Sequence, residues 1–335
     1  MTERILIARN GRLGDMVMVA PAVREILRRH PNAEFTLLTS ADGAALFQDF
    51  DPRIVRMLKH GRKPLTKRLK WIYLYFVIKR LNFNATYCLD GDWKIRKLLK
   101  LSAPNFIDVE SSASSRTFHG ALQALHQVGV DAKNLSDISV PFIPVSDDSV
   151  NAIEKLFSDN GISDTDYRIG LNPSFSGIRR RKTRKYKLWP AKYWAQLTDK
   201  LYQYGKEQNI PIKIMIYTLP KDKFLAEEIC SLCRQPPILL APESNLGLFK
   251  AYLSKIDLYI GPDTGGTHLA AGVGTDLISL FSVTDPFGCG PVVKDIKASI
   301  IRAEDRGEHG ALLDSILPDD VFTLAKNKIS LLTSP

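Results

Sequence analysis

Five glycines lie in the segment GPDTGGTHLAAGVGT, residues 261–275, which also contains Asp263, Thr264 and His268. The segment separates two apolar strand-like runs, so its glycines stand where a strand would turn into a helix. Free backbone N–H groups at a helix start attract anions, and glycine lets a phosphate come close. We therefore expect a phosphate-binding loop made of Asp263, Thr264, Gly265, Gly266 and His268. The structural alternative is a tight turn capped by Asp263 or Thr264, with His268 packed in the core.

A second candidate group, Asp15, follows the first apolar run in ARNGRLGD, residues 8–15. Gly11 and Gly14 lie in the loop between that run and a helical pattern that contains Pro21 near its start. Two roles stay open for Asp15: a carboxylate that complements the helix dipole, or a general base in the loop after the first strand. No G-x-S-x-G motif and no Ser/His/Asp spacing indicates a hydrolase instead.

A third segment, NPSFSGIRRRKTRKYKLWPAKYWAQL, joins the end of a strand to the start of a helix. Ser174 lies at the strand end, and Lys187 stands just before a helix that opens with Pro190. We expect Lys187 to bind phosphate, whereas most of the other basic residues between 179 and 185 form a solvated or lipid-facing surface. A proline and aromatic residues at a helix start are structurally ordinary.

These groups must be positioned by alternating strands and helices, which predict parallel β-α-β units. In the first half, the expected strands are residues 4–9, 34–40, 53–58, 85–90 and 105–110. The expected helices there are about 20–30, 64–81, 92–101 and 115–130. The segment 131–149, rich in Pro, Ser and Asp, breaks this rhythm and indicates an interdomain linker.

The alternation restarts after the linker. The expected strands are 168–173, 212–218, 237–241, 257–261 and 276–282, and the expected helices are 190–205, 221–233, 244–255, 265–273 and 318–332. The sequence therefore predicts an α/β protein of two facing, doubly wound domains. In such sheets ligands bind at the carboxyl ends of the strands, which places the site at the loops after residues 9, 173, 218 and 261.

Length and charge limit the classes of protein that fit. The chain has 335 residues, 44% of them hydrophobic, and a formal net charge of +10. Two basic clusters, residues 59–70 and 179–187, favour anionic partners. The first, with Arg62, Lys63, Lys67 and Arg68, runs into an aromatic segment that either contacts acidic lipid or acceptor, or packs as an amphipathic helix on the sheet.

The longest apolar run has eight residues, well short of the ~20 that span a bilayer, and the N-terminal segment does not read as a signal peptide. We therefore expect a cytoplasmic protein. Its four cysteines do not form a disulfide framework. The pair Cys230 and Cys233 lies in a helical pattern without a second ligand pair, so metal or redox use is weakly indicated.

Together these segments resemble glycosyltransferase family 9, the ADP-heptose:lipopolysaccharide heptosyltransferases. The resemblance lies in ILIARNGRLGDMVMVAPAVREILRRHPNAEFTLLTS, in NPS followed by KLWPAKYWAQL, and in DLYIGPDTGGTHLAAGVGTDLISLFSVTDPFGCGP. It implies a GT-B fold with two Rossmann-like domains, 1–145 binding the acceptor and 146–335 binding the sugar nucleotide. The C-terminal helix is then free to pack back on the N-terminal domain.

The resemblance also implies roles for individual residues. Asp15 matches the family's L-G-D aspartate, the base that deprotonates the acceptor hydroxyl, and Arg12 lies on the acceptor side. Lys187 matches the phosphate-binding lysine of K-x-W-P, and Ser174 lies near the phosphates. Asp222 is the candidate for an acidic residue that contacts the donor. The donor loop is Asp263, Thr264, Gly265, Gly266 and His268.

The function implied is inverting, metal-independent transfer of a heptose or related sugar from an ADP-sugar to an anionic, lipid-linked saccharide of lipopolysaccharide. No cofactor and no nucleic-acid partner is expected, and the protein would contact the cytoplasmic face of the inner membrane peripherally. One alternative is a transferase of the same fold with another nucleotide sugar or a non-lipid acceptor. A nucleotide-dependent oxidoreductase or epimerase is more distant, because RNGRLGD and LLTS lack the dinucleotide fingerprint.

Overall fold

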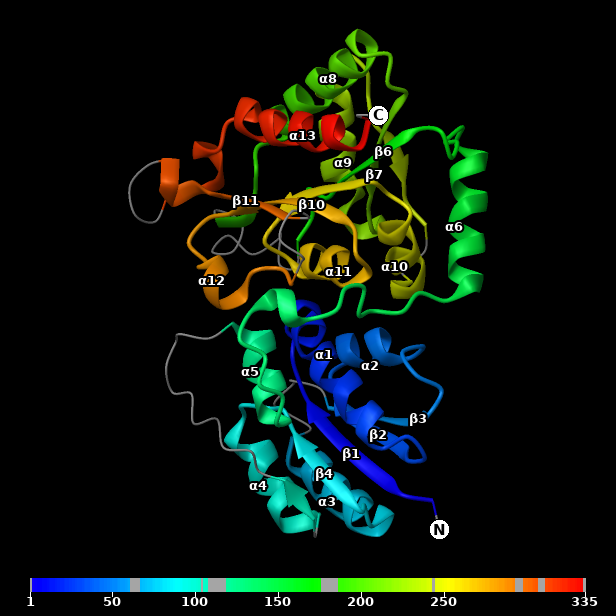
Figure 1. Ribbon diagram of the computed structural model, residues 1–335, viewed down its shortest axis with the longest axis vertical. Coiled ribbons are helices and arrows are strands. Elements are labelled where there is room, and N and C mark those ends of the chain that lie inside the picture. Colours follow the sequence, from blue (N-terminus) through cyan, green and yellow to red (C-terminus); the bar gives the residue numbers. More distant parts are fainter. Residues whose placement is uncertain are drawn as a thin grey trace. The chain divides into compact units, whose positions relative to one another are not determined.

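A computed structural model describes residues 2–60, 67–103, 105–107, 119–175, 186–242, 245–292, 298–306 and 311–333. The chain divides into two compact units, Met1–Pro144 and Val145–Pro335. Each unit is built on its own parallel sheet with helices on both faces (Figure 1). The predicted α/β, doubly wound architecture is confirmed.

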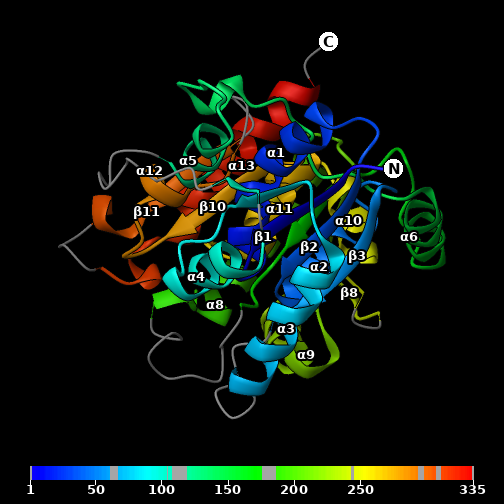
Figure 2. The same cartoon turned by 90° about the horizontal axis from the view of Figure 1, so that it is seen from below.

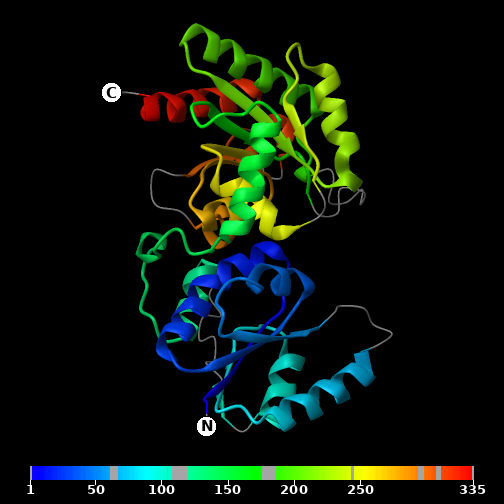
Figure 3. The ribbon, with the colours of Figure 1, turned by 90° about the vertical axis from the view of Figure 1, so that its right-hand side faces the viewer.

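The first unit contains a sheet in the order β3-β2-β1-β4-β5. Its strands are β1 (Arg4–Arg9), β2 (Glu34–Thr39), β3 (Ile54–Lys59), β4 (Ala85–Cys88) and β5 (Phe106–Ile107). Its helices are α1 (Leu13–Arg29), α2 (Ala41–Phe47), α3 (Lys67–Leu81), α4 (Trp93–Ser102) and α5 (Gly120–Gln127). Helices α1, α2 and α5 cover one face, and α3 and α4 cover the other (Figure 3).

The central strand β1 is apolar on both faces because both are covered. Its residues from Ile5 to Ala8 are fully buried, which is typical of a strand in the middle of a parallel sheet. On the α3 and α4 side, Leu74, Ile78 and Leu99 pack against this layer. The continuous apolar run that predicted the first strand is therefore the centre of the core.

The second unit contains a sheet in the order β11-β10-β9-β6-β7-β8. Its strands are β6 (Tyr167–Leu171), β7 (Ile212–Tyr217), β8 (Ile238–Leu240), β9 (Leu258–Pro262), β10 (Asp276–Phe281) and β11 (Ala298–Arg302). Its helices are α6 (Asp147–Asp159), α8 (Ala191–Glu207), α9 (Lys223–Leu232), α10 (Leu246–Ser254), α11 (Gly265–Val273), α12 (Pro286–Cys289) and α13 (Pro318–Thr333). Helix α8 packs between α9 and α13, and α10 packs against α6 and α11.

Several elements differ from the sequence prediction. Helix α1 begins at Leu13, seven residues earlier than the predicted start at about 20, because the apolar spacing already starts at the buried Met16 and Val17. Pro21 consequently lies inside α1 and not near its start. Helices α2 and α6 and the edge strand β11 were not predicted.

Helix α13 packs on the second unit, and the expected contact of this helix with the first unit stays a prediction. Its buried residues Val321, Ala325 and Ile329 belong to the core of the second unit, together with Trp194 and Leu197 of α8. The three residues follow a spacing of four, so they form one apolar stripe. The stripe fits the α8 face of the same unit, which determines where the helix packs.

We predict that Ile329→Ala destabilises the second unit by about 2–5 kcal/mol, because it leaves a cavity at a fully buried position. Leu331→Ala is the matched control, since Leu331 is 74% exposed on the same helix. Urea unfolding should be followed by tryptophan fluorescence with Trp71 and Trp93 replaced by Phe, which leaves Trp189 and Trp194 of the second unit as reporters. Equal unfolding midpoints for the two alanine variants would contradict the packing of α13 described above.

Candidate active site

Each sheet has a point where the chain reverses the direction in which strands are added. In the second unit the chain proceeds from β6 to β7 and β8, and then returns to place β9 on the other side of β6. In the first unit the reversal lies between β1 and β4. Loops at the carboxyl ends of such strand pairs diverge and leave room for a ligand. The loops after β6 and β9, and after β1 and β4, are therefore the places to build the site.

The glycine-rich loop lies at one of these points. Strand β9 ends at Pro262, Asp263 follows, and Thr264 is the extended N-cap residue of α11. The Thr264 hydroxyl makes no capping hydrogen bond. His268, in the first turns of α11, is 6% exposed, with its Nε2 3.7 Å from Asp263 Oδ1. The structure thus has the strand, turn and helix that the sequence predicted, with Thr264 at the cap.

The structure explains why position 266 is a glycine, which the sequence alone does not. A Cβ atom at Gly266 would lie 2.7 Å from Asn172 Nδ2 and 2.9 Å from the Tyr259 hydroxyl. Those two groups are joined, since Asn172 Nδ2 donates to Tyr259 Oη at 2.6 Å. Gly266 therefore lets α11 lie directly on a buried polar pair that links β9 to the loop after β6.

Lys187 contacts the same loop from another part of the chain. Its Nζ lies 2.9 Å from Asp263 Oδ2 and also donates to the Asp263 carbonyl oxygen. Burial disfavours the charged form of Asp263, but the adjacent His268 side chain and the charge of Lys187 outweigh it and lower the pKa of Asp263 to about 2. The loop therefore holds a buried carboxylate between a lysine and a histidine.

Trp189 explains why the K-x-W-P pattern positions Lys187. Its ring is fully buried, and its Nε1 donates to the Ile316 carbonyl oxygen at 2.9 Å. Pro190 then forms the N-cap of α8. On the other side of Lys187 in the sequence, the Tyr186 carbonyl oxygen accepts a hydrogen bond from Ser282 Oγ at 2.6 Å. This bond ties the segment to the loop after β10. The backbone on both sides of Lys187 is thus anchored in the core.

Ser174 and Asp222 also meet at the carboxyl edge of the sheet. Ser174 Oγ donates to Asp222 Oδ2 at 3.0 Å, and Asp222 is 7% exposed. They follow β6 and β7, which are parallel neighbours, so their loops leave the sheet at the same edge. The structure therefore joins two residues that are 48 positions apart and that were predicted separately.

Asp15 lies in the first turn of α1, where its Oδ2 accepts a hydrogen bond from the Arg12 backbone N–H at 2.9 Å. Gly11 allows this, because a Cβ atom there would lie 2.6 Å from Asp15 Cβ. Asp15 is half-buried and the Arg12 side chain is exposed. The capping role is therefore present, and the role of Asp15 as a base stays a prediction.

Asp90 is a buried carboxylate that sequence reasoning missed. It is 5% exposed, and it accepts backbone hydrogen bonds from Asn10 at 2.7 Å and from Asp92 at 2.8 Å. The side chain thereby ties the loop after β1, which leads to Asp15, to the loop after β4. The available signal was an acidic residue at the carboxyl end of a predicted strand, a position that favours site residues in open sheets.

The remaining predicted residues are described only in part. Arg62 and Lys63 lie outside the described residues. Lys67 and Arg68 begin α3, and only their backbone is described.

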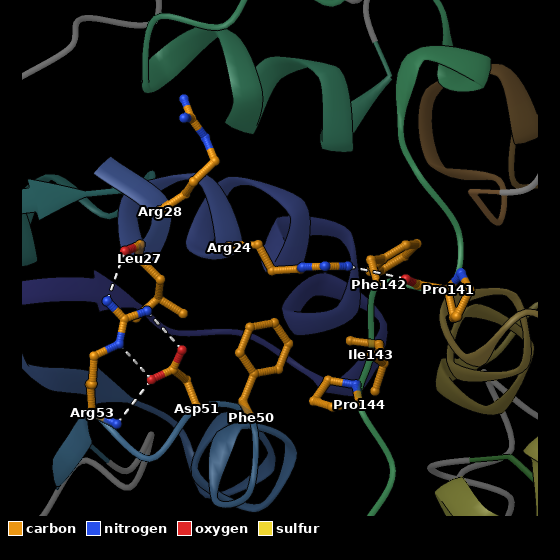
Figure 4. Close-up of a pocket in the computed structure, with 10 residues that line it drawn as sticks. All are labelled: Arg24, Leu27, Arg28, Phe50, Asp51, Arg53, Pro141, Phe142, Ile143 and Pro144. Atoms are coloured by element: carbon orange, nitrogen blue, oxygen red, sulfur yellow. Dashed lines mark hydrogen bonds and ion pairs between the residues drawn. The ribbon is translucent and has the colours of Figure 1, made fainter. Parts of the chain in front are cut away.

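A cavity of the first unit lies away from these loops, at the amino end of β3 (Figure 4). Its arginines have partners: Arg53 is paired with Asp51 and also donates to the Leu27 carbonyl oxygen, and Arg24 donates to the Pro141 carbonyl oxygen. Arg53 thus satisfies a carbonyl at the C-terminal end of α1. We interpret this charge as structural.

Cys230 and Cys233 are free thiols, and burial raises the pKa of Cys233 to about 11, which makes it a weak thiolate source. Within the described ranges, no three His, Cys, Asp or Glu side chains are grouped so that they could hold a metal ion.

Comparison with known proteins identifies the class. The model of glycosyltransferase family 9 (heptosyltransferase) matches residues 149–309. Lipopolysaccharide heptosyltransferase 3 of Escherichia coli is 22% identical over 285 residues, which cover 81% of each chain.

Two solved structures are similar over nearly the whole length. The family 9 glycosyltransferase of Veillonella parvula matches with a TM-score of 0.79 and 19% identity, over 99% of this chain and 98% of that one. The E. coli ADP-heptose lps heptosyltransferase II matches with a TM-score of 0.75 and 16% identity, over 99% and 100%.

This likeness shows that the fold is GT-B, the architecture of a large class of glycosyltransferases. The match to glycosyltransferase family 9 lies in the second unit, and the heptosyltransferase relative extends the similarity over most of the chain. The family match covers the loop with Asp263 and the segment with Lys187, whereas Asp15 lies outside it.

We predict that the Asp263 carboxylate stabilises the second unit by about 2 kcal/mol at neutral pH, from its pKa of about 2 against 3.8 unperturbed. Because the folded-state pKa is the lower one, this contribution is complete above about pH 5 and disappears as the pH falls from about 4 towards 2. The measurement is the change in unfolding free energy that Asp263→Asn causes in the Trp71→Phe/Trp93→Phe background, followed by the fluorescence of Trp189 and Trp194. A difference that stays constant between pH 6 and pH 3 would contradict the predicted ionisation.

Proposed function

We propose that this glycosyltransferase moves a heptose from an ADP-sugar to a lipid-linked saccharide of the lipopolysaccharide core, with inversion and without a metal. The names of its relatives support the sugar and the pathway: one is a lipopolysaccharide heptosyltransferase and another an ADP-heptose transferase. The observation that carries the proposal is the anchored Lys187–Asp263 pair at the start of α11.

The donor side follows from that pair. Departure of a nucleoside diphosphate builds negative charge on the phosphate that leaves the sugar, and a preorganised cation stabilises this charge best. Lys187 is held in place by Asp263 and by the buried Trp189 before any substrate binds. The free N–H groups at the start of α11 and the Thr264 hydroxyl would add hydrogen bonds to the same diphosphate.

Ser174 and Asp222 extend the donor site along the sheet edge. Their hydrogen bond fixes the Ser174 hydroxyl oxygen close to the end of β6. From that position Ser174 would contact the diphosphate, and Asp222 would contact the sugar or ribose hydroxyls.

The acceptor side is assigned to the first unit. Asp15 would remove the proton from the acceptor hydroxyl as the new glycosidic bond forms on the face opposite the leaving diphosphate. One Asp15 oxygen is engaged by the Arg12 N–H, which fixes the orientation of the carboxylate. The exposed Arg12 would contact an anionic acceptor.

An acceptor of this class is anchored in a bilayer, so the proposal places the protein peripherally at the cytoplasmic face of the inner membrane. None of the helices in the described ranges has the length and apolar content to cross a membrane.

We predict that the enzyme transfers sugar from ADP-heptose to a lipopolysaccharide-core acceptor in the presence of EDTA. Mass spectrometry should detect the product, and NMR should show an anomeric configuration opposite to that of the donor. UDP-glucose and GDP-mannose are the control donors. Preference for another donor, retention of configuration, or activity that returns only with Mg²⁺ or Mn²⁺ would each remove one part of the proposal.

Asp15→Asn separates the two roles of this residue. The amide oxygen can still accept the Arg12 N–H, but the side chain can no longer accept a proton, so we predict that the transfer rate falls by about 10²-fold or more. Thermal stability and the stabilisation by ADP should not change. Asp15→Ala is the companion variant and should lose both transfer and some helix stability. Substantial transfer by Asp15→Asn would mean that Asp15 acts only as a cap.

A further inference from the structure

Helix α3 has two apolar faces, and the core of the first unit uses one of them. Leu74 and Ile78 are buried against the sheet, and Trp71 and Tyr75 pack beside them. These positions, 71, 74, 75 and 78, follow the three- and four-residue spacing of one helix face. They account for the docking of α3 on the sheet.

A second set of large apolar side chains repeats this spacing on α3 and is exposed. The exposed fractions are 80% for Leu69, 55% for Ile72, 61% for Tyr73 and 62% for Phe76. We call these four residues the outer stripe. Successive residues turn by about 100° around a helix, and the two stripes are centred two residues apart, so they lie on opposite sides of α3. Helix α4 lies beside α3 on the same face of the sheet (Figure 2).

Positively charged residues of α3 border the outer stripe, and α3 contains no Asp or Glu. Lys70 and Lys79 flank the stripe on either side of the helix, and Arg80 follows Phe76 by one turn. Lys79 and Arg80 are exposed, and Lys79 Nζ lies above the Tyr75 ring at 5.6 Å from its centre. An apolar strip bordered by cations on long side chains is the composition of helices that lie in a membrane interface.

This charge argues against two other binding partners for the outer stripe, a second copy of the chain and nucleic acid. A second copy of the chain would bring two clusters of like charge together, which opposes association. Nucleic acid would use the cations but leaves the aliphatic Leu69 and Ile72 without a role, because its affinity comes from phosphate contacts and base stacking. A bilayer with acidic headgroups satisfies both parts of the surface.

We infer that the outer stripe inserts into the headgroup boundary of an anionic lipid bilayer, with Lys70, Lys79 and Arg80 bound to lipid phosphates. The inference deepens the proposed function, on which it rests, by naming the surface that brings the enzyme to a lipid-linked acceptor. The outer stripe contains none of the residues assigned to sugar transfer, so binding to lipid and sugar transfer can be measured separately.

The test is flotation of the purified full-length protein with vesicles of phosphatidylethanolamine and phosphatidylglycerol, compared with vesicles of phosphatidylcholine alone. Wild-type protein should float with the anionic vesicles, and 0.5 M NaCl should weaken this binding. The variant Ile72→Ser/Phe76→Ser should bind at least tenfold more weakly. Phe224→Ser/Leu232→Ser, a pair of exposed apolar residues on α9, is the matched control and should bind like the wild type.

A charge variant, Lys70→Glu/Lys79→Glu, should lose binding to anionic vesicles while remaining folded. Transfer to a soluble, delipidated acceptor should be unchanged in Ile72→Ser/Phe76→Ser, which separates this inference from the proposed function. Equal binding by wild type and stripe variants, or equal binding to both kinds of vesicle, would overturn the inference. So would sedimentation showing a dimer that the stripe variant abolishes while the wild type does not bind vesicles.

Discussion

The pairing of β6 with β9 is the constraint on which the second unit depends. The two strands are far apart in the sequence, yet the chain must insert β9 beside β6 after building β7 and β8 outward. This reversal brings the loop after β6 next to the glycine-rich loop after β9. The Asn172–Tyr259 hydrogen bond joins these two neighbours, and Gly266 leaves room for it. The position of α11, and with it the candidate donor loop, follows from this one pairing.

The electrostatics of the loop follow from its burial. Asp263 is 8% exposed, an environment that would neutralise an isolated carboxyl group. Lys187 and His268 reverse this effect and keep Asp263 charged. The carboxylate in turn keeps Lys187 at the loop when no substrate is bound. A diphosphate that binds at the start of α11 would therefore meet a cation whose position is already fixed.

Much of this arrangement was predictable from local patterns. Apolar runs marked every described strand except β11, and the turn GPDTGG marked a strand followed by a helix. Helices α2 and α6 were missed, because short or charge-rich helices resemble loops when only apolar spacing is read. Asp90 and the reason for Gly266 were also missed, since both depend on contacts between loops distant in the sequence. The packing of α13 required knowing which unit offers a matching apolar surface.

The sequence by itself determined the class of fold, the family resemblance and the residue types at the loops after the strands. These features are local: a spacing, a cap, a run of glycines or a cluster of charge. Tertiary structure alone decided that Lys187 is paired with Asp263, that Ser174 is joined to Asp222, and that α3 has an exposed apolar face opposite its buried one. The reason is physical, because strand order sets which loops meet, and the sheet can bury only one side of each helix that covers it.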